Sequence, residues 1–212
     1  MIDGISKFHP YEKTMTGCPA FRGMEEIPRK VVTYLLDMPS KGYVPPDDND
    51  YPRCRLAKYL FYDDAIPLQN KLPTPSEKLA ILYDPERPDG ATTEKGYRIF
   101  PQSYIGQSQT DAQTTLRIYM GRTIAKDTFS TELSIVFLIM SNVTYEPKAM
   151  GMARTFAMEQ ALLEALNGVN ISGIGTFYFD RRQHPDCGSD AIGDRGTNVG
   201  RRLTMGLTWA AE

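Results

Sequence analysis

The sequence predicts an α+β fold, in which a small, mostly antiparallel sheet carries one main packed helix and follows a proline-rich, loop-rich N-terminal half. Three observations predict this class. Residues 133–143 form an almost unbroken apolar run, as expected for a central strand covered on both faces. A helical period follows between Met152 and Leu166. Thirteen of the 15 prolines lie at or before Pro101, which excludes an ordinary run of long helices and central strands from that half.

The length of 212 residues favours one large domain, or one domain with a long extension, over two full domains. We divide the chain into a loop-rich N-terminal region at 1–95, packed on or extending the core, and an α+β core at 96–212. The charge is nearly balanced, with 24 basic and 26 acidic residues. This balance argues against tight nucleic-acid binding, which usually leaves a basic excess in the composition.

Cysteine usage and hydropathy indicate the kind of cellular compartment in which the protein is expected. The three cysteines, Cys18, Cys54 and Cys187, are an odd and widely spaced set, so we expect no disulfide framework and a reducing compartment. The opening residues lack the apolar core of a signal peptide, and the longest apolar run is too short to span a bilayer. We therefore expect neither secretion by that route nor a membrane partner.

The N-terminal half contains one strong helix pattern and two short apolar segments. Met24–Asp37 predicts a helix, because Ile27, Val31 and Leu35 recur at four-residue spacing behind two glutamates. The acidic, turn-rich connector that follows is expected to be a solvated loop. Residues 53–62 are compatible with a short helix or a strand. Residues 78–84 predict a short buried strand closed by a turn.

The core begins with extended segments. Residues 97–104 are expected to be extended as far as Pro101, which marks a sheet edge or a strand end. Residues 114–124 alternate apolar and polar side chains, which predicts a half-exposed strand. The residues from 121 to 131 are expected to form a loop into the central strand, long enough to reach a neighbouring molecule.

The helix after the central strand is expected to bury one face. Its members at 3.6-residue spacing are Met152, Phe156, Leu163 and Leu166. Glu159 and Glu164 lie off that face, and Gly168 is expected to end the helix.

Two further strands close the chain. Residues 174–181 and 201–209 alternate as well-packed strands do, the second with Leu203, Met205, Leu207 and Trp209 on one side. The polar, glycine-containing segment from 183 to 200 lies between them. We interpret it as a long hairpin arm, since loops of that length in compact domains tend to be functional or disordered.

Few residues point to catalysis. His184 and Cys187 lie close together, but neither the spacing nor further cysteines complete a zinc site. The glycines at 173–175 lack the third glycine and the helix of a dinucleotide loop. Phosphate-loop and nucleophile-elbow motifs are missing from the sequence. We therefore expect no enzyme activity, no cofactor and no bound metal.

Charged residues of both signs gather on and beside the arm. A solvated loop with local ion pairs and an intermolecular salt-bridge surface explain them equally well. The candidate interface residues are Arg122, Lys126, Arg181, Arg182, Asp186, Asp190, Asp194, Arg195, Arg201 and Arg202. The alternative use of these residues is a hydrolase or nuclease site built from the Asp and His side chains of the arm.

With these elements placed, the second half resembles the tail-terminator and neck proteins of tailed bacteriophages. The resemblance rests on the patterns ELSIVFLIMSNVTY, ARTFAMEQALLEALNG, GIGTFYF and GRRLTMGLTW, and it covers roughly residues 114–209. It implies a structural virion protein that forms a homo-oligomeric ring between a connector and the tail tube, assembled in the host cytoplasm. The arginines at both feet of the arm can also face phosphates, and the balanced charge makes the expected contact with DNA passing through the ring loose and nonspecific. A protein- or glycan-binding accessory module is the remaining alternative.

Overall fold

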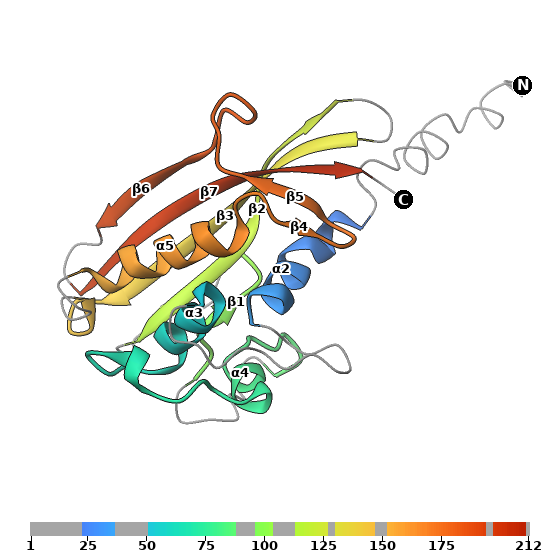
Figure 1. Ribbon diagram of the computed structural model, residues 1–212. Helices are drawn as coiled ribbons and strands as arrows, with labels where there is room; N and C mark the ends of the chain where they lie inside the picture. Colours follow the sequence, from blue (N-terminus) through green and yellow to red (C-terminus); the bar gives the residue numbers. More distant parts are fainter. Residues whose placement is uncertain are drawn as a thin grey trace, which may run out of the picture.

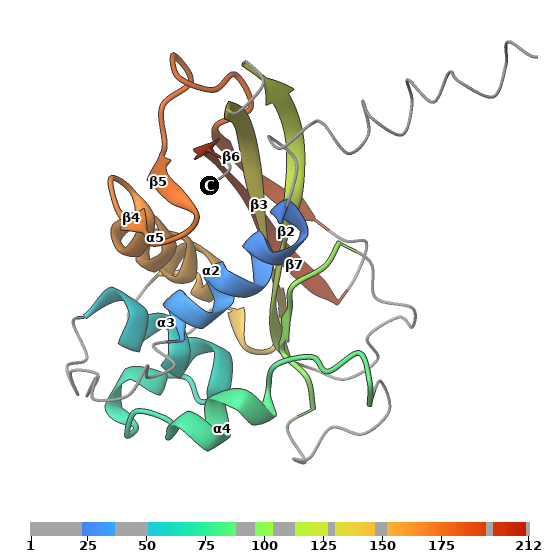
Figure 2. The same cartoon turned by 90° about the vertical axis from the view of Figure 1, so that its right-hand side faces the viewer.

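The computed structural model describes residues 23–36, 51–87, 96–103, 113–126, 130–146, 152–193 and 197–210, and it confirms the α+β class. A layer of helices lies on one face of a twisted sheet (Figures 1 and 2). The helical elements are η3 (Met24–Glu26), α2 (Ile27–Leu35), α3 (Pro52–Phe61), η4 (Pro67–Gln69), α4 (Pro75–Ala80) and α5 (Arg154–Leu166). The strands are β1 (Ile99–Phe100), β2 (Thr114–Ala125), β3 (Ser130–Asn142), β4 (Asn170–Ile171), β5 (Gly175–Tyr178), β6 (Gly188–Gly193) and β7 (Asn198–Ala210).

The sheet is larger than predicted, and it is mixed. Its seven strands follow the order β1-β2-β3-β7-β5-β4, and β6 also pairs with β7. The long strands β2, β3 and β7 are antiparallel neighbours, whereas β1 is parallel to β2. β5 and β6 lie one after the other along the same edge of β7, because β5 pairs with its residues 206–207 and β6 with 199–204.

The central strand β3 has two unequal faces. Its helix-facing side chains, including Leu133, Phe137 and Ile139, are fully buried. On the opposite face Leu138 and Met140 are only partly buried. On this second face the predicted cover is present at Ser134 and Val136, which are buried, and is incomplete at Leu138 and Met140. Leu138 and Met140 are apolar, and sequence periodicity cannot distinguish a half-exposed apolar position from a buried one.

Helix α5 is present where predicted, but it buries a different face. Phe156 is 36% exposed and Met152, just before the helix, is 43% exposed. The side chains turned inward are Arg154, Thr155, Met158, Glu159, Ala161, Leu162, Ala165 and Leu166. Two alanines on this face suit close packing, and the buried charges have ion-pair or hydrogen-bond partners. A hydropathy pattern assigns such charges to solvent, which explains the rotated prediction.

The N-terminal helices share one hydrophobic core with the sheet, since Ile27 of α2 and Leu60 of α3 cluster with Leu116 and Phe137. The helix predicted at 24–37 is confirmed within its described part, and residues 53–62 are helical.

The strand predicted at 78–84 is wrong. Residues 75–80 form α4, and only Leu82 makes an isolated bridge, to Ile99. Thr74 and Glu77 form a capping box at the N-terminus of this helix. A capping box with proline at the first helical position favours a helix start over a strand, and it outweighs the short apolar run.

Buried basic side chains satisfy the carboxyl ends of two helices. Arg154 donates to the carbonyls of Tyr59 (3.0 Å) and Tyr62 (2.7 Å) at the end of α3. Arg98 donates to the carbonyl of Leu60, at 3.1 Å. Lys78 donates to the carbonyl of Leu36 after α2, at 2.9 Å. Each cation lies at the negative end of a helix dipole, where positive charge is favoured.

The two predicted long loops are largely strand. β2 continues to Ala125 and β3 begins at Ser130, so the expected loop at 121–131 is a hairpin whose residues 127–129 lie outside the described part. In the predicted arm at 183–200, residues 188–193 form β6. Backbone pairing explains both corrections, of β2 with β3 in the first case and of β6 with β7 in the second, because polar, glycine-containing residues can form a strand without an apolar pattern.

Candidate interaction surface

Two segments project beyond the helical layer at one end of the sheet. They are the far half of the β2–β3 hairpin and the loop between β5 and β6, and they lie side by side (Figures 1 and 2). The guanidinium of Arg122 on the hairpin lies 4.0 Å from the carboxylate of Asp186 on the loop. The fold thus brings together two candidate interface residues that are 64 positions apart in the sequence.

A β-bulge aims Arg122 at this loop. The pairing of β2 with β3 shifts between Met120 and Thr123, so that β2 carries an extra residue there. The backbone N–H of Arg122 donates to the Ser134 hydroxyl (2.7 Å) instead of to a ladder carbonyl. Bulges bend the strand and redirect a side chain. The bulge therefore turns a strand residue of the hairpin toward the β5–β6 loop.

The β5–β6 loop is held by contacts of its own side chains, of which His184 and Cys187 are buried and Arg181 is exposed. His184 is fully buried, and its Nδ1 accepts a hydrogen bond of 3.2 Å from the backbone N–H of Asp186. The Nε of Arg181 donates to the carbonyl of Cys187, at 2.8 Å. The buried Cys187 thiol lies 3.7 Å from the carbonyl of Tyr178, a donor–acceptor distance at the long end for sulfur. These contacts give the loop a fixed shape that presents Asp186.

Charged groups on the projecting end form local ion pairs. Arg182, whose side chain is 90% exposed, lies 2.9 Å from the Asp180 carboxylate, and this hydrogen bond lowers the pKa of Asp180. Lys126 lies 2.6 Å from Glu132 at the base of the hairpin tip. Exposed pairs of this kind stabilise a fold by less than about 1 kcal/mol, so they remain available for exchange with a partner.

The remaining candidate residues lie along β6 and β7. Arg202 and Asp190 form a cross-strand pair of 2.9 Å on the face opposite the helices. Arg201 points to the helix side and forms an ion pair with the buried Glu159 of α5. Asp194 and Arg195 lie outside the described residues. Arg201 is thus engaged inside the subunit, whereas Arg202 and Asp190 are surface groups.

Exposed apolar side chains beside β6 are not among the candidates taken from the sequence. Phe156 of α5 lies under the guanidinium of Arg201, 5.1 Å from its ring centroid. Arg201 in turn donates to the Ser189 hydroxyl of β6, at 2.8 Å. Phe156 therefore lies next to the β6–β7 pair, and we refer to Phe156 together with Met152, which is exposed four residues earlier in the chain, as the apolar shelf. The 3.6-residue pattern placed both side chains on the buried face of the helix. It would have predicted their exposure only if the buried face had been assigned correctly.

The residues considered for catalysis have unsuitable surroundings. His184 has no exposed surface, and burial raises the pKa of the Cys187 thiol, whereas a reactive cysteine needs a lowered pKa. Among the residues that the structure describes, no three His, Cys, Asp or Glu side chains are grouped as a metal site would require. The described part of the arm thus offers no assembled hydrolase site.

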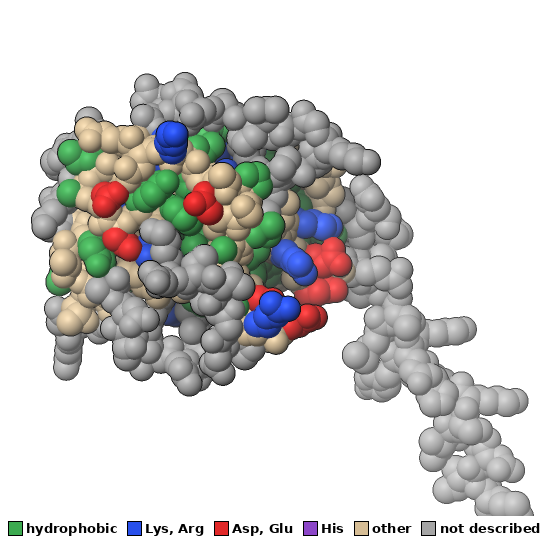
Figure 3. Space-filling view, turned by 90° about the horizontal axis from the view of Figure 1, so that it is seen from below, with side chains coloured by type: hydrophobic (Ala, Val, Ile, Leu, Met, Phe, Trp, Pro, Cys, Tyr) green, Lys and Arg blue, Asp and Glu red, His purple; other side chains and the backbone are tan. Residues whose placement is uncertain are grey.

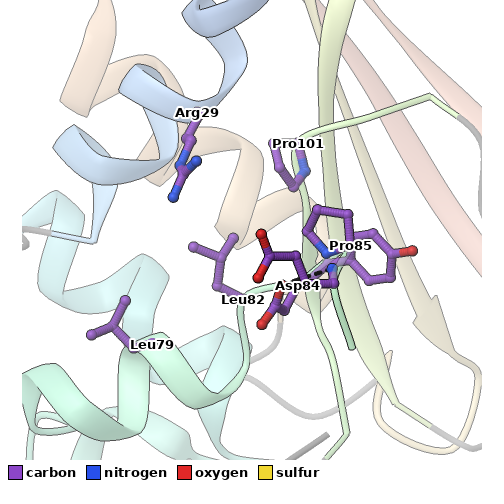
Figure 4. Close-up of a pocket in the computed structure, with 8 residues that line it drawn as sticks. Arg29, Leu79, Leu82, Asp84, Pro85 and Pro101 are labelled. Atoms are coloured by element: carbon purple, nitrogen blue, oxygen red, sulfur yellow. Dashed lines mark hydrogen bonds between the residues drawn. The ribbon is translucent and has the colours of Figure 1, made fainter. Parts of the chain in front are cut away.

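An open cleft lies between α2, α4 and β1, with a volume of about 440 Å³. Figure 4 shows Leu79, Leu82 and Pro101 on its walls, with Arg29 and Asp84 at its rim. The Asp84 carboxylate accepts the backbone N–H of Glu86 at 3.0 Å, so it is turned toward its own turn. Seen from below, the surface mixes hydrophobic, acidic and basic side chains (Figure 3). The charged groups of the cleft do not converge on one point, as those of a catalytic site would.

Comparisons with known proteins add no family assignment, because neither the scan against family models nor the search of curated proteins found a match. In the described part of the chain, each helix is too short or too polar to cross a bilayer.

Proposed function

We propose that the protein is a structural subunit of a bacteriophage virion, forming a homo-oligomeric ring at the neck or at the head-proximal end of the tail. In this role it joins the connector to the tail tube. The observation that carries the proposal is the projecting end of the sheet, where the hairpin and the β5–β6 loop meet at Arg122 and Asp186, whose charged groups lie 4.0 Å apart. A rigid body that presents charged strand ends suits repeated contacts between copies.

The internal construction supports this role. Arg154 and Arg98 fix the end of α3 against α5 and β1 through buried hydrogen bonds, and Arg201 fixes α5 against β7. A body held in this way keeps the projecting segments in a constant position, which a ring of identical contacts requires. Contact with DNA passing through the ring is expected to be loose, because basic and acidic residues are nearly equal in number.

Size and location test the proposal together. Light scattering and negative-stain microscopy of the purified full chain are expected to show closed rings. Mass spectrometry of particles of the encoding phage, with labelling by a specific antibody, is expected to place the chain at the neck. A chain that stays monomeric at high concentration and is missing from particles would overturn the proposal.

A further inference from the structure

The sheet has two open edges on opposite sides of the molecule. On one side, β6 pairs with β7, and no described strand pairs with its other edge. On the other side, β1 covers β2 only opposite Leu116 and Arg117. The backbone of β2 from Tyr119 to Ala125 is therefore paired with β3 alone among the described strands. Unpaired edges present rows of N–H and C=O groups that accept another strand.

The directions of the two edge strands suit a head-to-tail contact. β2, β3, β7 and β6 alternate in direction, since each neighbouring pair is antiparallel. β2 and β6 therefore run in opposite directions. A second copy, rotated about an axis to which the strands are tilted, brings its β2 antiparallel to β6 of the first copy and shifts it along the strands. The same contact can then repeat from copy to copy until a ring closes.

The register of the sheet sets the offset between copies. Gly188 of β6 is level with Thr204 of β7, Val136 of β3 and Tyr119 of β2. Residues 188–193 of β6 therefore lie level with residues 114–119 of β2. The part of β2 that pairs with β3 alone, from Tyr119 to Ala125, lies beyond the N-terminal end of β6. Pairing requires a shift of about six residues along the strands, roughly 20 Å at about 3.3 Å per residue. A closed sheet has such a stagger because its strands tilt against the ring axis.

The side chains beside the two edges are complementary in size. On the helix side of β6, the shelf of Phe156 and Met152 is exposed. On the same side of β2, the small residues Thr123 and Ala125 lie in register with Leu133 and Thr131 of β3, both of which are buried. A large aromatic side chain next to small strand residues extends the core across the junction and covers the shelf.

The charges beside the two edges are also complementary. On the hairpin, the side chains of Arg122 and Lys126 are 62% and 53% exposed. On β6, the side chain of Asp190 is 60% exposed. Each of these groups has an oppositely charged partner inside its own subunit, namely Asp186, Glu132 and Arg202. The side chains on the β2 edge are cationic and the one on the β6 edge is anionic, so exchange of these surface pairs across the junction favours the heterologous arrangement.

From these observations we infer that the open edge of β2 in one copy adds antiparallel to β6 of the next copy, which makes one continuous sheet around the ring. This inference rests on the proposed ring and names the surfaces that form it. The occupant of the β6 edge is a second copy of this chain, and the shelf of Phe156 and Met152 becomes part of the subunit interface.

Cysteine cross-linking tests the inference. In a Cys18→Ser background, the remaining Cys54 and Cys187 are buried. We expect the double variant Thr123→Cys/Ala191→Cys, whose positions lie opposite each other after the six-residue shift, to give a ladder of covalently linked copies on a non-reducing gel when it is oxidised in the assembled state. The exposed pair Glu25→Cys/Ser172→Cys is the control, and it should give no ladder. A covalent dimer from Ala191→Cys alone would show β6 paired with β6 and overturn the inference.

Hydrogen exchange gives a second test that needs no substitution. The assembled wild-type protein is expected to protect amides in both 119–125 and 188–193 relative to the dissociated protein. Rings that form without this protection would overturn the inference about strand addition but would not contradict the proposed ring. A wild-type chain that forms no ring would overturn both the inference and the proposed function.

Discussion

Glu159 of α5, only 2% exposed, is held by the guanidinium of Arg201 of β7 in an ion pair that joins the helix to the sheet. One oxygen of the carboxylate, Oε1, is buried without a hydrogen bond. A buried carboxylate depends on its partner, because an unpaired charge in a dry site is costly. The pair therefore determines how firmly α5 and the apolar shelf are attached.

Removing the cation of this pair is expected to destabilise the protein strongly. Arg201→Met should lower the free energy of unfolding by about 3–5 kcal/mol, since it leaves Glu159 buried and unpaired. Urea denaturation followed by circular dichroism measures the change. Arg202→Met is the matched control, because Arg202 pairs on the surface with Asp190 and should cost less than about 1 kcal/mol. Equal losses in the two variants would contradict the importance of burial.

A second prediction concerns Arg154, the largest fully buried side chain among the residues that the structure describes. Its guanidinium donates to the carbonyls of Tyr59, Tyr62 and Asp64, and burial lowers its pKa. Arg154→Met should cost about 3 kcal/mol or more, because the carbonyls lose their donors in a buried place. Thermal unfolding provides the measurement.

Arg182→Met is the control for this substitution, because the Arg182 side chain is 90% exposed. A melting temperature for Arg154→Met that matches that of Arg182→Met would show that the end of α3 finds other donors.

Much of the sheet can be predicted from the sequence, because strands β2, β3 and β7 have the alternation or apolar run that pairing requires. Leu203, Met205, Leu207 and Trp209 are buried as predicted, although Thr204 and Gly206 between them are buried as well. β6 is different. Its side chains carry no apolar pattern, and it exists because its backbone pairs with β7. The residues of β6 themselves give no sequence signal that they pair with β7.

The candidate site was predictable in composition but not in arrangement. Charge patterning pointed to Arg122, Asp186, Asp190 and Arg202, and the structure shows which of them meet. The bulge that aims Arg122 depends on a hydrogen bond to Ser134, twelve residues away. The inward turn of Arg201 depends on Glu159. Both arise from tertiary packing, which outweighs local hydropathy.

Glycine at 175 supplies a third prediction, on the attachment of β5 to β7. Gly175 has a φ of 118°, and a Cβ there would collide with the carbonyl oxygen of Thr208. Gly175→Ala should destabilise the protein by about 1–3 kcal/mol through strain and displacement of β5.

Gly193→Ala is the matched control for this position, since nothing lies within 4 Å of a Cβ at Gly193. We expect it to change the urea midpoint by no more than the error of the measurement. A midpoint for Gly175→Ala that equals that of Gly193→Ala would show that the β5 backbone can relax.

Thiol reactivity tests the fixed shape of the β5–β6 loop. In a Cys18→Ser variant, only Cys54 and Cys187 remain, and both are buried. Burial also raises the pKa of Cys187, so less thiolate is present near pH 8 than in an exposed cysteine. Modification by a chromogenic disulfide is expected to be at least about tenfold slower than in 6 M urea, because attack needs the loop to open.

His184→Ala should speed the reaction of Cys187 and leave that of Cys54 unchanged, since His184 accepts the Asp186 N–H that shapes the loop. Rapid labelling of Cys187 in the native Cys18→Ser variant, located by peptide mass spectrometry, would show that the loop opens freely and cannot hold Asp186 beside Arg122.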